Sequence, residues 1–120
     1  MPQTPALAHL RLPLFVFGTL RRGQCNHHLL QDRYARCLPA ELPDYTRVEE
    51  LMIDRQPGGV VQGELFTLSP EVYEQTLADC DELEEIPLGE LIGHEYERRQ
   101  VAVQVTGGSG LAWAYVRPDR

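Results

Sequence analysis

The chain has few cysteines and no pattern that would pair them. Cys25, Cys37 and Cys80 are odd in number and widely spaced, and no Cys-x-x-Cys motif occurs. Small secreted domains held together by disulfides normally carry an even number of cysteines at closer spacing. We therefore expect a reduced, cytoplasmic protein whose cysteines are free thiols.

Positive charge is also scarce. The 120 residues include 11 basic and 18 acidic side chains, which gives a net charge of −7. Affinity for nucleic acid comes largely from Lys and Arg side chains that neutralise phosphates, so this balance argues against a nucleic-acid partner. The arginine pairs Arg21–Arg22 and Arg98–Arg99 are only local features.

Long hydrophobic runs are absent as well. No apolar run approaches the ~20 residues that span a bilayer, and the first residues lack the basic and long apolar segments of a signal peptide. A chain of 120 residues is close to the usual size of one domain. We predict a short N-terminal tail over residues 1–11 and a single domain over residues 12–120, without membrane contact.

Short strand patterns make up most of the remaining sequence. We expect strands over residues 12–17, 46–53, 60–68, 96–105 and 111–116. The turn-rich segment DRQPGG should join the second strand to the third, and TGGSG should form a four- or five-residue hairpin loop before the last strand. Pro39 and Pro43 are expected to break the chain. Val101, Val103 and Val105 should share one face of their strand.

Two helices are expected beside these strands. Asn26 can cap a short helix that carries Leu29 and Leu30. Ser69 is followed by Pro70 and an acidic residue, which is typical of a helix start, and this helix should run to about residue 83 or 84. Strands and helices do not alternate strictly, which favours a small mixed α+β fold or a partly closed barrel.

The stretch FVFGTLRRG, residues 15–23, ends an apolar strand in a glycine and becomes charged at once. Exposed backbone N–H groups after a strand can bind an anionic group without a charged side chain. Gly18 has no Cβ, so the backbone there can come close to a ligand. The alternative is an ordinary turn at the end of a strand.

The acidic segment DCDELEE, residues 79–85, contains one carboxylate in an unusual place. At about 100° per residue, Glu84 falls on the helix face of Tyr73, Leu77 and Cys80, whereas Glu82 falls on the opposite face. Burial and nearby like charges would raise the pKa of Glu84, so that it could take and return a proton near neutral pH. The alternatives are that Glu84 caps a loop amide or forms an ion pair with Arg98 or Arg99.

These two stretches, together with three others, resemble the gamma-glutamylcyclotransferase-like family, also described as AIG2-like. The family opens with an apolar strand that ends in Tyr-Gly-Ser/Thr-Leu, here FVFGTLRRGQCN. Its other motifs are matched in order by VQGELF, CDELEE, YERRQVAV and AWAYV. The likeness extends from residue 12 to residue 116, and its strength lies in the order of the motifs.

The resemblance implies a small mixed β-barrel of five or six strands with flanking helices. It also implies an enzyme that releases 5-oxoproline from a gamma-glutamyl amine, amino acid or related amide, with Glu84 as general acid and base. The substrate-binding residues that it implies are Phe17, Gly18, Thr19, Leu20 and Tyr96. No metal or cofactor is implied, the expected partner is a small gamma-glutamyl substrate, and the expected state is a monomer or a weak homodimer.

Three departures from the family pattern bear on the substrate. Phe17 replaces the usual Tyr, which removes a hydroxyl group, and Glu85 replaces the usual Gly after the catalytic glutamate. The segment from Glu84 to Tyr96 is long, and could be a lid or a specificity loop. A second hypothesis, from a different class, is a non-catalytic module that binds a small acidic metabolite and has no need of Glu84.

Other candidate residues have a structural alternative. Cys25, His27, His28 and Cys37 match no standard zinc spacing. Cys80 is expected to be a small core residue rather than a nucleophile. His94 could orient a substrate or simply lie in a solvated loop, and Arg98, Trp113 and Tyr115 could line the cavity or pack within their strands.

Overall fold

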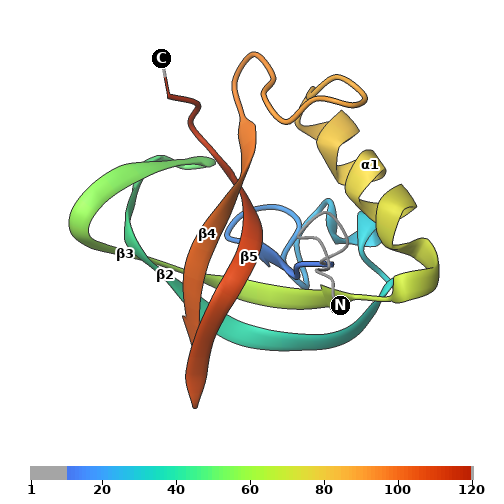
Figure 1. Ribbon diagram of the computed structural model, residues 1–120, viewed down its shortest axis with the longest axis horizontal. Helices are drawn as coiled ribbons and strands as arrows, with labels where there is room; N and C mark the ends of the chain where they lie inside the picture. Colours follow the sequence, from blue (N-terminus) through green and yellow to red (C-terminus); the bar gives the residue numbers. More distant parts are fainter. Residues whose placement is uncertain (1–10, 120) are drawn as a thin grey trace, which may run out of the picture.

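Five strands close into a barrel in the computed structural model, which describes residues 11–119 (Figure 1). They are β1 (Leu14–Val16), β2 (Tyr34–Glu49), β3 (Met52–Leu68), β4 (Glu97–Val105) and β5 (Gly108–Val116). Their order around the barrel is β1-β3-β2-β4-β5, with β1 and β5 parallel and the other pairs antiparallel. The predicted mixed barrel is confirmed. The predicted tail lies outside the described residues except for Arg11.

One α-helix, α1 (Tyr73–Leu83), and two short 3-10 helices, His27–Leu29 and Pro70–Val72, accompany the barrel in the described range. The helical segments begin where the sequence predicts, but the side chains of Ser69 and Asn26 cap neither of them. The Asn26 amide instead donates to Thr19 Oγ1 at 2.9 Å. None of the helices in residues 11–119 has the length and apolar character needed to cross a bilayer.

The long hairpin of β2 and β3 differs from the prediction. β2 continues through Pro39 and Pro43, which were expected to break the chain. Prolines lack the N–H that a ladder needs, but β2 pairs with β4 only at Glu41, so few ladder bonds are lost on that side. The hairpin turns at residues 50–51, between the end of β2 and the start of β3.

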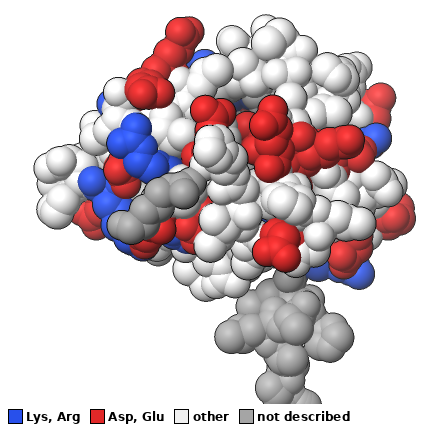
Figure 2. Space-filling model, turned by 90° about the horizontal axis from the view of Figure 1, so that it is seen from above, with Lys and Arg blue, Asp and Glu red and all other residues white. Residues whose placement is uncertain are grey.

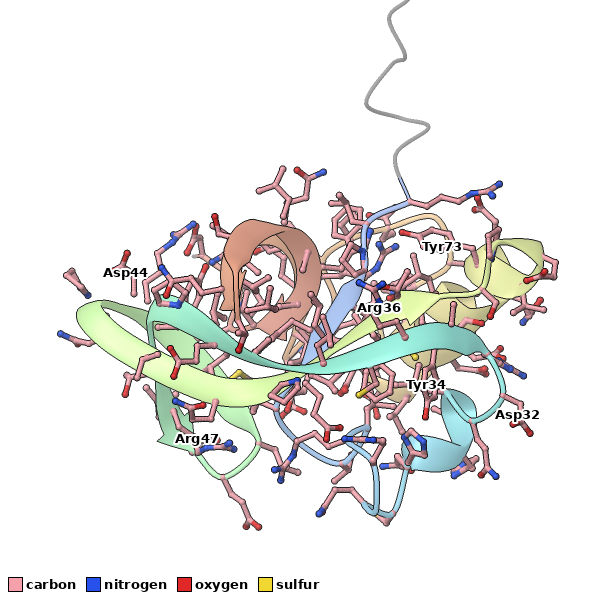
Figure 3. All side chains as sticks on the ribbon, turned by 90° about the horizontal axis from the view of Figure 1, so that it is seen from below. Asp32, Tyr34, Arg36, Asp44, Arg47 and Tyr73 are labelled. Atoms are coloured by element: carbon pink, nitrogen blue, oxygen red, sulfur yellow. The ribbon has the colours of Figure 1, made fainter. Side chains whose placement is uncertain are left out.

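The segment DRQPGG therefore lies inside β3 and does not form the predicted turn. It forms a bulge, because Pro43 pairs with Val60 while Tyr45 pairs with Arg55. Asp44, which is labelled in Figure 3, accepts a hydrogen bond from the Gly58 N–H at 3.0 Å, and both residues have a positive φ. Turn-forming residues thus mark a bend in a continuous strand pair.

Two apolar clusters build the core. One fills the barrel and includes Val101 and Val103, with Val105 packed at its edge, as their alternation predicts. The other lies between the barrel and α1, where Leu77 and Cys80 are buried against strand residues. α1 covers one side of the barrel in Figure 1, and its apolar face determines which of its carboxylates turn inward.

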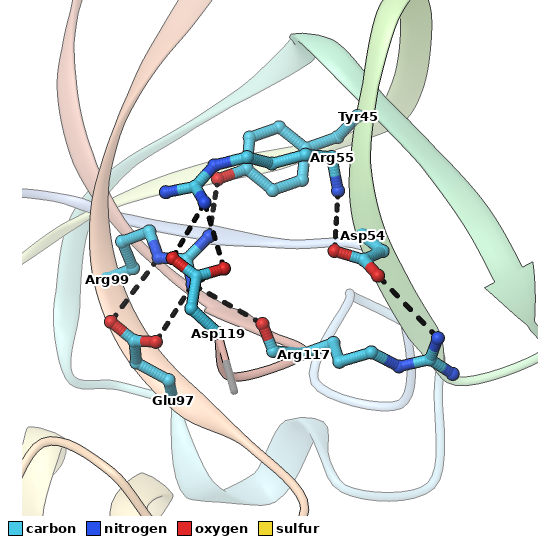
Figure 4. Close-up of polar contacts among 7 residues, drawn as sticks. All are labelled: Tyr45, Asp54, Arg55, Glu97, Arg99, Arg117 and Asp119. Carbon is cyan, nitrogen blue, oxygen red and sulfur yellow. Dashed lines mark hydrogen bonds and ion pairs between the residues drawn. The ribbon is translucent and has the colours of Figure 1, made fainter.

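The hairpin of β4 and β5 and the C-terminal segment complete the barrel. Val105 pairs with Gly108, so the connection has two residues rather than the predicted four or five. After β5, Asp119 pairs with Arg55 at 2.7 Å and with Arg99 at 3.3 Å (Figure 4). Arg99 also pairs with Glu97 at 2.8 Å. Because Arg55 lies on β3 and Arg99 on β4, Asp119 links the segment after β5 to both strands.

Candidate active site

The loop after β1, the end of α1 and the turn between β2 and β3 border one cavity. Its volume is about 450 Å³, within the range of pockets that bind small molecules. All six predicted site residues line it, namely Phe17, Gly18, Thr19, Leu20, Glu84 and Tyr96. The fold therefore brings together the two stretches that the sequence singled out, although they lie far apart along the chain.

The cavity loop, residues 17–20, is anchored through its carbonyl oxygens. Every one of these four oxygens accepts a hydrogen bond. The donors are Arg47 Nη2 to Phe17 (3.1 Å), Arg21 N and Nε to Gly18 (both 3.1 Å), Asn26 N to Thr19 (2.9 Å) and His27 Nδ1 to Leu20 (3.0 Å). A carbonyl oxygen only accepts, so His27 Nδ1 carries a proton in this contact.

The N–H groups of the same loop remain open. Those of Gly18, Thr19 and Leu20 donate to no group among residues 11–119. Because the N–H and C=O of a trans peptide point in opposite directions, anchoring the carbonyls also fixes the direction of the N–H groups. Successive N–H groups of a turn form a concavity that binds anions. The cavity loop can thus hold a carboxylate or a developing oxyanion.

The end of α1 carries Glu84 to this cavity. The Glu84 N–H still bonds to the Cys80 carbonyl at 3.2 Å, and Ile86 N donates to the Asp81 carbonyl at 2.9 Å. Between them Glu85 adopts a φ of 60°, the left-handed conformation that glycine favours at the end of a helix. The helix-ending turn therefore forms with Glu85 in place, at a cost in backbone strain.

Glu84 is partly buried, and its side chain has no hydrogen bond or ion pair with the other residues of the described range. Burial, and after it the charges of Asp81 and Glu95, raises the pKa of Glu84 to about 7. A carboxyl group with this pKa can take and return a proton near neutral pH. Glu82 faces solvent, as the helical periodicity predicts.

Asp81 forms a hydrogen-bonded cluster next to this site, and the sequence reasoning missed it. It accepts two hydrogen bonds from Arg98, at 2.8 and 3.1 Å, and one from the Tyr115 hydroxyl at 2.6 Å. The spacing contains a signal, because Asp81 precedes Glu84 by three residues and so lies on a neighbouring part of the same helix face. Arg98 is thereby occupied and does not pair with Glu84.

Two of the three aromatic candidates line the cavity, and the third lies outside its lining. Tyr96 and Tyr115 line the cavity. The Tyr96 hydroxyl donates to the Leu51 carbonyl and so links the start of β4 to the turn between β2 and β3. Trp113 and Arg98 lie outside the cavity lining, with the guanidinium carbon 4.4 Å from the centre of the indole ring. Leu51 is a lining residue that no sequence pattern indicated.

The cysteines and histidines form no metal site within residues 11–119. His27 packs against the rings of Tyr34 and Phe66 in addition to its bond with the cavity loop. Cys80 is fully buried, and burial raises the pKa of its thiol to about 12, which fits a core residue. Cys25 is exposed and lines the cavity, and His94 is exposed in the loop before β4.

Carboxylates are prominent at the end of the molecule that carries the loop after α1. Figure 2, which looks onto this end, shows Asp and Glu side chains in a band with few arginines among them. A second groove of about 770 Å³ lies between α1 and residues 85–91. Size alone does not mark the active site. The smaller cavity is the candidate because a partly buried carboxyl group, unpaired within residues 11–119, and the open N–H groups both line it.

Comparison with known proteins places this geometry in context. Residues 14–120 match the family model described as gamma-glutamyl cyclotransferase, AIG2-like. A relative from Niallia circulans, the gamma-L-glutamyl-butirosin B gamma-glutamyl cyclotransferase, is 32% identical over 108 residues. The match covers 86% of this chain and 65% of that relative, so the chain spans less than two thirds of its length.

Solved structures show the same fold. A protein of Arabidopsis thaliana, determined in solution, is 26% identical with a TM-score of 0.65, and the match covers 88% of this chain and 61% of that one. A structure named gamma-glutamyl cyclotransferase is 15% identical with a TM-score of 0.61, and covers 90% of this chain and 67% of its own. At that identity the second likeness concerns the fold alone.

Proposed function

The chain belongs to the gamma-glutamyl cyclotransferase, AIG2-like family, and we propose that it releases 5-oxoproline from a gamma-glutamyl amine, amino acid or related amide. The observation that carries this proposal is the position of Glu84. Its unpaired carboxyl group, with a pKa raised to about 7, lines the same cavity as the open N–H groups of residues 18–20. One group can move a proton and the others can hold negative charge.

The proposed reaction is an intramolecular displacement. The α-amine of the gamma-glutamyl group attacks its own γ-carbonyl carbon, a C–N bond closes the five-membered ring, and the bond to the leaving nitrogen breaks. The two protons that the α-ammonium loses end on the released amine, so no water is consumed. Because the nucleophile belongs to the substrate, positioning supplies much of the rate, and the chemistry requires neither a protein nucleophile nor a metal.

Each cavity element has one role in this proposal. Glu84 takes a proton from the α-ammonium, which frees the amine for attack, and then gives it to the leaving nitrogen. The N–H groups of Gly18, Thr19 and Leu20 bind the substrate carboxylate and the oxygen that becomes negative at the γ-carbon. Phe17 and Tyr96 enclose the gamma-glutamyl group. The proposed location is the cytoplasm, where the three cysteines would remain free thiols.

The test is a search for the product. The purified protein is incubated with a panel of gamma-glutamyl amines, amino acids and amides, and 5-oxoproline is measured by mass spectrometry. Release from at least one compound supports the proposal. A folded protein that binds such a compound at the cavity but releases no 5-oxoproline from any of them would instead be a binding module for a small acidic metabolite.

A further inference from the structure

Arg47, which is labelled in Figure 3, is an exposed residue near the end of β2 whose side chain contacts the cavity loop. Its Nη2 donates to the Phe17 carbonyl at 3.1 Å, and its guanidinium carbon lies 5.0 Å from the centre of the Phe17 ring. Its Nη1 donates to the Glu50 carbonyl at 2.5 Å. One side chain thus joins the loop after β1 to the turn between β2 and β3.

The first contact acts on a single peptide group. The carbonyl that accepts from Arg47 belongs to the same peptide as the Gly18 N–H, and the two point in opposite directions. A cationic donor on the carbonyl therefore sets the orientation of the N–H, and it draws electron density from the nitrogen, which makes the N–H a stronger donor. Of the four carbonyls in the cavity loop, only that of Phe17 accepts from the side chain of a strand residue within residues 11–119.

The second contact acts on the opposite wall. Leu51 lines the cavity, and it follows directly after the residue whose carbonyl Arg47 binds. The Leu51 carbonyl in turn accepts from Tyr96, and a Cβ placed on Gly18 would lie 3.3 Å from the Leu51 side chain. The turn between β2 and β3 is therefore tied to the cavity loop through Arg47 and to the start of β4 through Tyr96.

We propose that Arg47 is a positioning residue for the cyclisation, which holds and polarises the Phe17–Gly18 peptide so that the Gly18 N–H donates to the oxyanion formed at the γ-carbon. The inference rests on the proposed function. The Phe17 ring supports the guanidinium by a cation–π contact, which needs no hydroxyl group. Phe in place of the family's usual Tyr is compatible with this role.

The kinetic test compares Arg47→Met and Arg47→Lys with Arg36→Met. Arg36 is also exposed on β2 and lies well away from Arg47 in Figure 3, and its side chain makes no ion pair or hydrogen bond within residues 11–119. Because the contact concerns charge that develops in the transition state, Arg47→Met should lower kcat by about 10- to 100-fold with a much smaller change in KM. Arg47→Lys should recover part of the loss, and Arg36→Met should match the wild type.

A spectroscopic readout separates this inference from the proposed function. The backbone 15N signal of Gly18 in the free protein should move in Arg47→Met, move less in Arg47→Lys, and stay in place in Arg36→Met. If the wild type releases no 5-oxoproline, the proposed function fails, while the Gly18 signal still decides whether Arg47 holds and polarises the Phe17–Gly18 peptide. An unchanged Gly18 signal in Arg47→Met, or a kcat equal to that of Arg36→Met, overturns the inference.

Discussion

Two carboxylates near the end of α1 meet opposite surroundings. Asp81 is bound by Arg98 and Tyr115, and the Asp81 and Arg98 side chains are only 13% and 12% exposed. Glu84, one turn later, has no partner within residues 11–119 and lines the cavity instead. A buried charge without a partner costs stability. The comparison therefore separates a carboxylate that links α1 to β4 and β5 from one that, in our proposal, is available to a ligand.

The largest effect should come from replacing the free carboxyl group. Glu84→Gln keeps the shape of the side chain but cannot exchange a proton, so the rate of 5-oxoproline release should fall by about 10²- to 10⁴-fold. Binding of a gamma-glutamyl compound, measured by calorimetry, should change far less. Glu82→Gln is the matched control, because Glu82 faces solvent on the same helix. Equal turnover by the two variants would remove Glu84 from the mechanism.

Replacing the paired carboxyl group should instead affect stability. Asp81→Asn leaves the Arg98 guanidinium without its charged partner in a largely buried place, which should lower the free energy of unfolding by about 3 kcal/mol. Urea unfolding measures the loss. The double variant Asp81→Asn with Arg98→Met should recover part of it, since it removes the unpaired charge. A single variant as stable as the wild type would show that this pair contributes little.

A smaller effect of opposite sign is expected for the stability of Glu84→Gln. The pKa of Glu84 in the folded protein, about 7, lies above that of an unfolded glutamate. The folded state therefore loses stability as the pH rises from about 4 through 7. At pH 8 the variant should be more stable than the wild type by about 1 to 3 kcal/mol, and at pH 4 the two should agree. A constant difference at both pH values would contradict this origin.

The fold was predictable where apolar residues recur without interruption, at every second position in a strand or about every 3.6 positions in a helix. Val101 and Val103 alternate into the barrel, and Leu77 and Cys80 share the buried face of α1. The hairpin of β2 and β3 was not predictable in the same way. Pro43 and the glycines of DRQPGG signal a turn locally, but pairing over two long strands turns the same residues into a bulge. Tertiary pairing outweighed the local turn preference there.

The candidate site was predictable to the extent that it lies in two short segments. Glu84 could be singled out because it is a charged residue on the apolar face of a helix. The loop around Gly18 could be singled out because an apolar strand ends there in a glycine. Leu51 and Arg47 could not, because both fall in the strand predicted over residues 46–53, where neither residue stands out from its neighbours, whereas the structure places Leu51 in the turn between β2 and β3. Leu51 lines the cavity and Arg47 contacts the Phe17 carbonyl because the fold brings the turn between β2 and β3 next to the cavity loop.

The most direct test of the account is the pH dependence of 5-oxoproline release by the wild-type protein. If the carboxyl group of Glu84 is the proton carrier, kcat/KM should rise with pH with a midpoint near 7, the pKa that burial and neighbouring charges give it. A rising limb centred near the pKa of an ordinary glutamate, about 4.3, would contradict the claim that this unpaired group drives the reaction.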